Sequence, residues 1–266
     1  MVFNPLPGFE LIWDFVAFII SFILIMLLVQ INAKIEKSGK LSTIVTRKVI
    51  HTFAAPIWVL TWILFSGSIF SRWFALIVPL LFVLQFVAIG TGKVQNEDFV
   101  RSMSRSGNPR ELLGGTLYYA FMMVVLAIIW FYTPSPDLTG ATPAALVVFG
   151  CLAGGDGFAD VIGRKYGGEK KFGIGGAEKT IAGTVGMFIG SFLFSTILVF
   201  LFSLEVASFA LANLIVPIII VCIIATIVEA LTPKGLDNLT ITIAAMIVIF
   251  ILPFVGLWSY PMFTLF

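Results

Sequence analysis

The chain has 266 residues, of which 59% are hydrophobic and 11% charged, and its formal net charge is +2. Soluble domains carry about 25% charged residues, so these charges are too few to cover a soluble surface. The composition excludes a cytosolic enzyme, a disordered chain and a nucleic-acid-binding domain, which would need a basic stripe.

Hydropathy predicts an all-α polytopic membrane protein with about eight transmembrane helices in a single integral membrane domain over 1–266. Helices that cross ~30 Å of hydrocarbon need about 20 apolar residues. The fifth segment has only 15 apolar residues before Asp156, so it breaks at its glycines or runs on through polar residues to about 166. The predicted segments are about 11–33, 49–66, 73–91, 112–133, 141–155, 180–204, 206–230 and 239–260.

The loops between these segments alternate between loops rich in Lys and Arg and loops with almost no charge. Fifteen of the 16 basic residues fall in the first, third, fifth and seventh loops, and only Arg72 lies opposite. The positive-inside rule makes the basic side cytoplasmic and places both ends of the chain outside. Ten of the 14 acidic residues share that side. We therefore expect active-site loops that face the cytoplasm.

Two further features predict where the chain resides. All six tryptophans lie in the outer halves of the predicted segments, as an aromatic belt at one interface would. The first ten residues contain no basic stretch and leave no room for a transit peptide. We therefore expect a retained first segment and a prokaryotic plasma membrane.

The second segment begins with Arg47, Lys48 and His51, which can face one direction on a helix. This arrangement favours phosphate binding by the two cations, with His51 as a donor or proton carrier. His51 is the only histidine, which rules out a multi-histidine metal centre. The alternative is basic anchoring at the membrane interface. Further along, Arg110 and Glu111 begin the fourth segment and either contribute to a phosphate site or act as an anchor and a cap.

The fifth loop carries the strongest chemical signal. Asp156 and Asp160 are four residues apart, so on a helix their side chains share one face about 6 Å apart. Two carboxylates that close favour a hard divalent ion such as Mg²⁺, whose shell phosphates can complete. Arg164 continues the same face; the alternative is an Asp156 helix cap with an Asp160–Arg164 surface pair. Neighbouring candidates for phosphate binding are Gly155, Gly157 and Lys165.

A glycine-rich stretch from Gly173 to Thr180 precedes the sixth segment. It is not a P-loop, because Glu178 replaces the required second glycine and no strand is predicted before it. Free backbone N–H groups, a helix N-terminus and Lys179 still favour an anion site that includes Thr180. The alternative is a flexible loop in which Thr180 or Glu178 caps the helix. Within that helix, Gly186 and Gly190 predict close helix packing.

The seventh loop adds three polar candidates. Glu229 lies near the end of an apolar segment and therefore needs a partner. Asp237 and Asn238 either bind polar groups of a ligand or cap the last segment.

Together these motifs resemble the phytol kinase and dolichol kinase family of CTP-dependent polyprenol kinases, from Arg47 to about Thr240. The similar stretches are R-K-x-x-H at 47–51, S-R-S-G-x-P-R-E-L-L at 104–113, G-G-D-G-x-A-D-x-I-G-R-x-x-G at 154–167, E-K-T-x-A-G-T at 178–184 and V-E-x-L…D-N-L-T at 228–240.

The resemblance implies transfer of the γ-phosphoryl group of CTP to a prenyl alcohol such as phytol, geranylgeraniol or farnesol. It implies Mg²⁺ at Asp156 and Asp160, and Asp160, His51 or Glu229 as the group that takes the alcohol proton. The phosphate ligands would include Arg47, Lys48, Arg164 and Lys179. The expected partners are a nucleoside triphosphate, a prenyl alcohol from the bilayer and membrane lipids, with no nucleic acid.

Three alternatives remain at this stage. A CDP-lipid synthase resembles the 154–184 region and would use the α-phosphorus of CTP, but the 47–51 and 105–113 stretches favour the kinase. A CTP-dependent diacylglycerol kinase is the second. A transporter or a lipid-binding scaffold without catalysis would show ionisable residues deep in the segments and internal repeats, and neither is visible.

Overall fold

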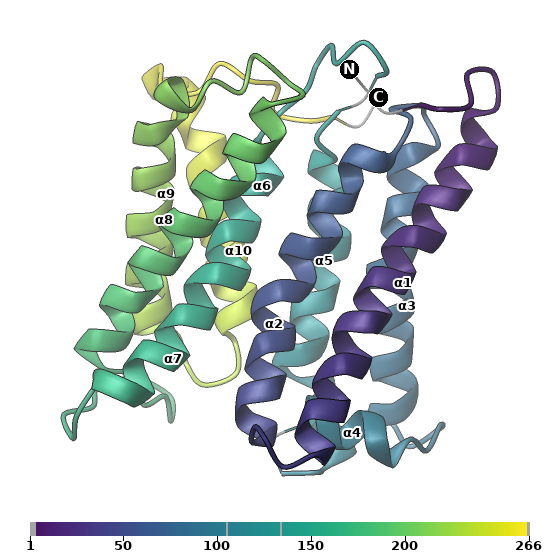
Figure 1. Cartoon of the computed structure of the whole chain (residues 1–266). Coiled ribbons are helices and arrows are strands. Elements are labelled where there is room, and N and C mark those ends of the chain that lie inside the picture. Colours follow the sequence, from purple (N-terminus) through teal and green to yellow (C-terminus); the bar gives the residue numbers. More distant parts are fainter. Residues whose placement is uncertain (1–3, 105, 134, 265–266) are drawn as a thin grey trace.

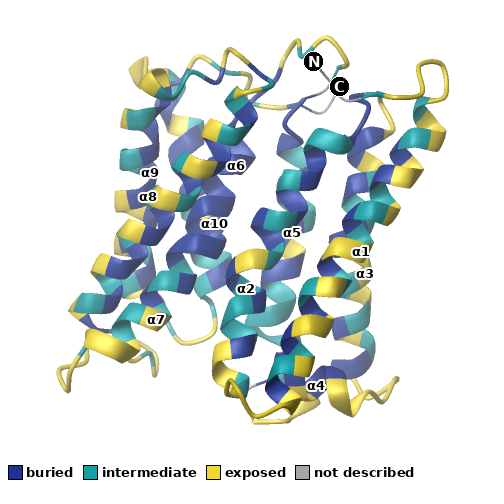
Figure 2. Ribbon diagram, viewed as in Figure 1, coloured by how far each residue is buried: buried dark blue, intermediate teal, exposed yellow. Residues whose placement is uncertain are grey.

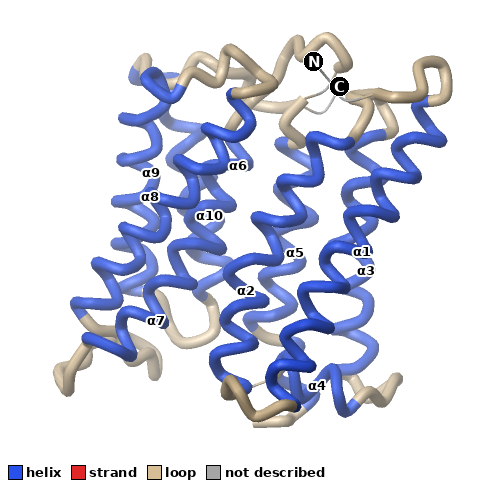
Figure 3. Tube along the Cα trace, viewed as in Figure 1, coloured by secondary structure: helices blue, strands red, loops and turns tan. Residues whose placement is uncertain are grey.

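The computed structural model describes residues 4–104, 106–133 and 135–264, and within these ranges every regular element is helical (Figures 1 and 3). Arg105, which belongs to the 104–113 motif, lies outside the described residues. The helices are α1 (Glu10–Lys37), α2 (Thr43–Leu60), α3 (Ser71–Gly90), α4 (Glu97–Met103), α5 (Gly115–Trp130), α6 (Ala144–Phe149), α7 (Asp156–Tyr166), α8 (Ile181–Ser203), α9 (Leu211–Leu231) and α10 (Asp237–Ile251). Short helical turns are η1 (Thr61–Leu64), η2 (Pro109–Leu113), η3 (Gly150–Gly155) and η4 (Leu252–Val255).

Seven helical stretches of the described chain are long and apolar enough to cross a membrane. They begin with α1 and include α6 and α7 as one stretch, Ala144–Tyr166. The remaining expected segment is α2, which is less apolar because Arg47, Lys48 and His51 occupy its first half. It packs along α1 and continues through η1 (Figure 1). The polytopic helical architecture predicted from hydropathy is confirmed.

The order of the helices places the basic residues at one end of the bundle. That end, the lower one in Figure 1, holds α4, the end of α7 and the turn between α9 and α10. Every described Lys and Arg except Arg72 lies in the elements and loops that meet there. The alternation of loops read from the sequence is therefore present in the structure.

The expected interruption of the fifth segment takes the form of a π-helical turn, η3, which joins α6 to α7 without a change of chain direction. Its glycines let α8 approach very closely. A Cβ on Gly150 would lie 2.1 Å from Ser195 Oγ, and a Cβ on Gly190 would lie 2.3 Å from the carbonyl oxygen of Gly154. The close packing predicted for Gly186 and Gly190 is confirmed.

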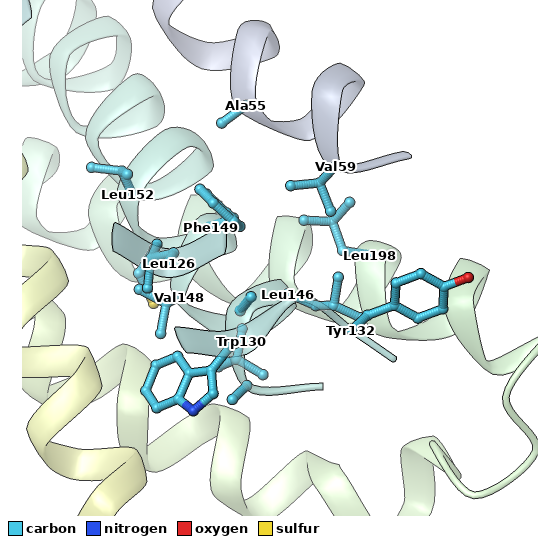
Figure 4. Close-up of a cluster of buried hydrophobic side chains, with 14 of the residues drawn as sticks. Ala55, Val59, Leu126, Trp130, Tyr132, Leu146, Val148, Phe149, Leu152 and Leu198 are labelled. Carbon is cyan, nitrogen blue, oxygen red and sulfur yellow. The ribbon is translucent and has the colours of Figure 1, made fainter. Parts of the chain in front are cut away.

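The core surrounds α6, which is buried along its whole length (Figure 2). Phe149 projects from it into the cluster drawn in Figure 4, where Trp130 and Tyr132 also lie. Trp58, Trp62 and Trp130 are fully buried, and their rings pack inside the bundle. The aromatic-belt prediction is therefore wrong for these residues, because packing in the core rather than an interface holds their rings.

Candidate active site

A cavity of about 1040 Å³ lies at the end of the bundle that holds α4 and collects most of the predicted site residues. Its polar walls come mainly from α2, α7, the loop before α8, α9 and α10, and apolar residues of α1, α3, α4 and α5 also line it. The predicted residues on its walls are Arg47, Lys48, His51, Glu111, Asp156, Asp160, Arg164, Lys179, Thr180, Glu229, Asp237 and Asn238. Segments that are distant in the sequence thus form one polar site.

Asp156 is the first centre of this site. Lys48 Nζ donates to Asp156 Oδ2 at 2.8 Å, and both side chains are largely buried. His51 Nδ1 lies 3.5 Å from the same oxygen. A charge removed from water needs a partner, and here the partner on α2 fixes α2 against α7.

The ring of His51 is oriented by Asn238. The side-chain amide of Asn238 donates from Nδ2 to the carbonyl oxygen of Gly115 at 2.7 Å, so its Oδ1 faces His51 Nε2 at 3.1 Å. Nε2 therefore carries the proton, and in the neutral ring Nδ1 keeps a lone pair. Nδ1 is buried and forms no hydrogen bond. This leaves one basic nitrogen directed toward Asp156.

Tyr119 supports the same histidine from the other side. The two ring centroids are 4.2 Å apart. The Tyr119 hydroxyl donates to the carbonyl oxygen of His51 at 2.7 Å and accepts from Ala55 N at 3.2 Å. These bonds hold α5 against α2 one turn before Pro56, whose missing N–H weakens the helix there.

Lys179 is the second centre. Its ammonium group contacts the carboxylates of Glu229 and of Asp237, the latter at 2.7 Å. Burial alone would lower the pKa of Lys179, but the two carboxylates outweigh this effect and raise the pKa above its ordinary value. Glu229 thus has the partner that its position near the end of an apolar segment required.

The glycine-rich loop places Lys179 at this position. Phe172 and Lys179 exchange two backbone hydrogen bonds of 2.9 and 2.7 Å, and the chain turns between them with Gly175 at φ +59°. Thr180 then caps α8, because its hydroxyl accepts from Gly183 N at 3.1 Å. The capping alternative for Thr180 is therefore present, and Thr180 also borders the cavity.

Asp160 pairs with Arg164 on the same face of α7. Arg164 Nε and Nη2 each lie 2.9 Å from Asp160 Oδ1. The surface pair considered from the sequence is therefore formed, while both side chains still line the cavity. Asp156 and Asp160 project into one space, as their spacing predicted.

Asp156 and Asp160 are the pair of carboxylates on one face of α7 that could contribute to a metal site. In the described parts of the chain, no group of three or more His, Cys, Asp or Glu side chains is arranged to hold a metal ion. Two carboxylates do not fill the coordination shell of a hard divalent cation. Asp156 and Asp160 could therefore hold such an ion only if phosphate oxygens or water molecules supply its other ligands. This is the usual manner in which Mg²⁺ binds with a nucleotide.

Four predicted phosphate-binding residues lie outside the cavity. Gly155 and Gly157 are packing positions, since an added Cβ would lie 2.2 Å from Ser191 Oγ and 2.2 Å from Thr52 Oγ1, respectively. The Lys165 ammonium group lies over the ring of its neighbour Tyr166, facing a separate groove. Arg110 belongs to η2 and does not border the cavity.

Several polar residues of the cavity were not among the predicted site residues, and Lys171, Lys234 and Tyr119 are examples. Lys171 and Lys234 lie in the basic loops, whose charge was the available signal. Tyr119 belongs to a Tyr-Tyr pair that follows the 104–113 motif in the family resemblance, but its contact with His51 was not predictable because it joins residues 68 positions apart.

Comparison of the sequence with known proteins identifies relatives of the chain. The chain is 31% identical over 229 residues to the probable chloroplastic phytol kinase of Zea mays, covering 85% of this chain and 72% of that protein. It is also 31% identical over 252 residues to the chloroplastic farnesol kinase of Arabidopsis thaliana, covering 92% of this chain and 78% of the relative. Phytol kinase 1 of the same plant is 31% identical over 216 residues, or 80% and 68% of the two chains.

The chain belongs to the phytol kinase family. No protein-family model and no solved structure matches it. These phytol and farnesol kinases are plant proteins whose names place them in chloroplasts, so they give no support to the expectation of a prokaryotic source.

Proposed function

We propose that this member of the phytol kinase family is a membrane-embedded kinase that transfers the γ-phosphoryl group of CTP to a prenyl alcohol. The observation that carries the proposal is a single cavity in which several carboxylates, several cations and an apolar wall meet. Phosphoryl transfer depends mainly on positioning and on neutralising charge, and the polar walls offer the groups for both.

The triphosphate would bind where the cations lie. Lys48, Arg164 and Lys179 are each paired with carboxylates. A nucleotide that arrives with Mg²⁺ brings both signs of charge, so Asp156 and Asp160 can hold the cation while Lys48 and Arg164 turn to phosphate oxygens. The site exchanges its ion pairs and leaves no buried charge without a partner.

Bound Mg²⁺ would supply neutralisation of the charge on the β- and γ-phosphates. The protein's own contribution is the placement of Asp156 and Asp160 on one face of α7. Lys179, held between Glu229 and Asp237, is fixed just before the N-terminus of α8, where free backbone N–H groups favour an anion.

Among the three candidate bases, the contacts favour His51. Asp160 and Glu229 are engaged by Arg164 and Lys179, whereas His51 Nδ1 is without a hydrogen bond. In the reaction the alcohol oxygen bonds to the γ-phosphorus, and the bond from that phosphorus to the β–γ bridging oxygen breaks. CDP leaves with the electron pair, and the alcohol proton passes to Nδ1, where Asp156 stabilises the imidazolium.

We further propose that the end of the bundle with the cavity faces the cytoplasm. The basic residues gathered there support this orientation through the positive-inside rule. Nucleotide would then enter from water while the alcohol comes from the bilayer.

The proposal is tested by incubating the purified protein in lipid with Mg²⁺, phytol or farnesol, and CTP or ATP in turn. We expect a prenyl monophosphate, detected by mass spectrometry, with CTP as the better donor. Asp156→Asn should abolish turnover while the variant still folds, as judged by its circular dichroism spectrum. Absence of product with every donor, or full activity of Asp156→Asn, would contradict the proposal.

A further inference from the structure

We infer that the inner, apolar part of the cavity receives the isoprenoid tail of the alcohol and that its floor limits the chain length accepted. This inference rests on the proposed function and names the place of the acceptor within it. The region, called here the tail chamber, is formed by α1, α2, α3 and α5. Its walls include Ile25, Ala54, Val78, Phe82, Ala120 and Met123.

The tail chamber lies inside the protein. Ile25, Val78, Ala120 and Met123 are 3%, 1%, 3% and 6% exposed, although all four border the cavity. Protein interiors are close-packed, and apolar space left unfilled costs stability. Retention of such space beside a polar site therefore points to an apolar ligand that fills it.

Helix α4 separates the tail chamber from the aqueous side. Its apolar residues Phe99, Val100 and Met103 are buried in a cluster with Val29 and Phe86, and Met103 borders the cavity. The helix lies across the lower end of the bundle (Figure 1). A chamber closed in this way favours an apolar occupant.

Two ion pairs fasten α4 in this place. Arg101 Nη2 lies 3.0 Å from Glu36 Oε1, and Lys37 Nζ lies 2.9 Å from Asp98 Oδ1. Both ion pairs connect α4 to the C-terminal end of α1. Together with the buried apolar residues of α4, they hold this helix over the tail chamber.

The junction of the two parts of the cavity is the His51–Tyr119 pair. On the polar side His51 faces Asp156, and on the apolar side Tyr119 is followed by Ala120 and, one turn later, Met123. An alcohol whose tail fills the chamber presents its hydroxyl to His51. The chamber therefore places the acceptor oxygen where the proposed base lies.

The depth of the tail chamber can be estimated along α3. Phe86 and Val78 both border the cavity, and eight residues of helix rise ~12 Å. Fully extended farnesyl and geranylgeranyl chains are longer than this rise, so a tail must bend to lie within the cavity of about 1040 Å³, and a long polyprenol would meet the floor at Val78 and Met123. We therefore expect farnesol and geranylgeraniol to be better acceptors than long polyprenols.

A second apolar groove, of about 440 Å³, lies between α2 and α7 and also reaches Lys48 and Asp160. Its residues Val45, Phe53 and Val161 are 44%, 42% and 55% exposed on the outer surface. Any lipid chain can cover such a surface, so it offers a prenyl tail no advantage over bulk lipid. This contrast favours the tail chamber and provides a matched control.

The test compares kcat/KM for farnesol and geranylgeraniol in three variants, two of which add the same volume at different places. Val78→Phe should shorten the chamber and lower the geranylgeraniol-to-farnesol ratio of kcat/KM at least about tenfold, because several methylene groups lose their burial. Met123→Ala should raise the ratio. Val161→Phe, in the outer groove, should leave the ratio within about twofold of the wild type.

The outcomes separate the inference from the proposed function. No product from the wild-type protein with either alcohol would overturn the proposed function and the inference with it. An active wild type with an unchanged ratio in Val78→Phe and Met123→Ala, or a ratio shifted by Val161→Phe, would overturn the inference alone. If Val78→Phe fails to fold, Met123→Ala decides, since it shifts the ratio in the opposite direction.

Discussion

Lys179 joins three parts of the chain, because its ammonium group contacts Glu229 from α9 and Asp237 from α10. These ion pairs fix the positions of the loop before α8, α9 and α10 relative to one another, besides placing charged groups in the cavity. Because Glu229 lies near the end of an apolar segment, the sequence predicted that it needs a partner. Which cation it would meet was not predictable, because 50 positions separate the two residues and only the packing of α9 against α8 brings them together.

Replacement of Lys179 by methionine should be strongly destabilising. Glu229, whose side chain is 4% exposed, would remain as a buried carboxylate without its cation, at a cost of about 3–5 kcal/mol in the free energy of unfolding. Adding Glu229→Gln should recover most of that stability and none of the turnover. Denaturant unfolding in detergent measures the first effect, and a double variant as unstable as the single one would contradict the assignment.

The stability that the Lys179–Glu229 ion pair contributes depends on pH in a defined range. The pKa of Lys179 is raised in the folded state, so its stabilising contribution is complete below the ordinary value of 10.5. It is lost only as the pH rises through the raised value. Wild-type stability should therefore fall more steeply above that pH than the stability of the Lys179→Met/Glu229→Gln variant.

Asp160 tests the metal assignment at the residue scale. Asp160→Asn keeps the size of the side chain and removes the charge, so we expect turnover to fall at least about 100-fold and the Mg²⁺ requirement to rise. Asp137→Asn is the matched control, because Asp137 is exposed in the loop between α5 and α6, at the opposite end of the bundle. An unchanged Mg²⁺ titration in Asp160→Asn would show that this carboxylate does not hold the ion.

At the scale of the elements, hydropathy predicted the helices well because a long apolar run in a membrane has few other structures. The boundaries moved where local geometry intervened. The last segment, expected to reach 260, ends with η4 at Val255, where Gly256 adopts φ +71° and stops the helix. The π-helical form of η3 was not predictable, because it depends on how closely α8 approaches the glycines of η3. The sequence alone does not show which helix packs against those glycines.

That approach gives a prediction for α8. Gly190→Ala would place a methyl group 2.3 Å from the Gly154 carbonyl oxygen, so the helices must separate, at a cost of about 1–3 kcal/mol. Ile189→Ala introduces the same residue one position earlier, at a side chain that is 46% exposed, and should cost far less. Thermal unfolding of the two variants in one detergent compares them directly, and equal losses would show that the close contact is absent.

At the scale of the whole molecule, the charge pattern defines two different ends. The sequence predicted this segregation, since loops alternate in Lys and Arg content, and the helix order confirms it. The cavity itself was only partly predictable. Polar motifs indicated its charged wall, whereas the tail chamber depends on the arrangement of α1, α3 and α5, which no local pattern specifies.

The orientation of the two ends is open to measurement. The native cysteines, Cys151 and Cys222, are fully buried and should not react with a membrane-impermeant maleimide. In intact cells Asp137→Cys should be labelled at once, while Lys170→Cys, in the loop after α7, should be labelled only after permeabilisation. The reverse pattern would place the cavity on the outer side.

The most direct test of the central claim uses CTP labelled at either the α- or the γ-phosphate. The purified protein in lipid receives Mg²⁺, a prenyl alcohol and one of the two labelled nucleotides, and the lipid product is extracted and counted. We predict label in the lipid from the γ-position and none from the α-position. Label from the α-position would indicate cytidylyl transfer, and it would contradict the assignment of this protein as a prenol kinase.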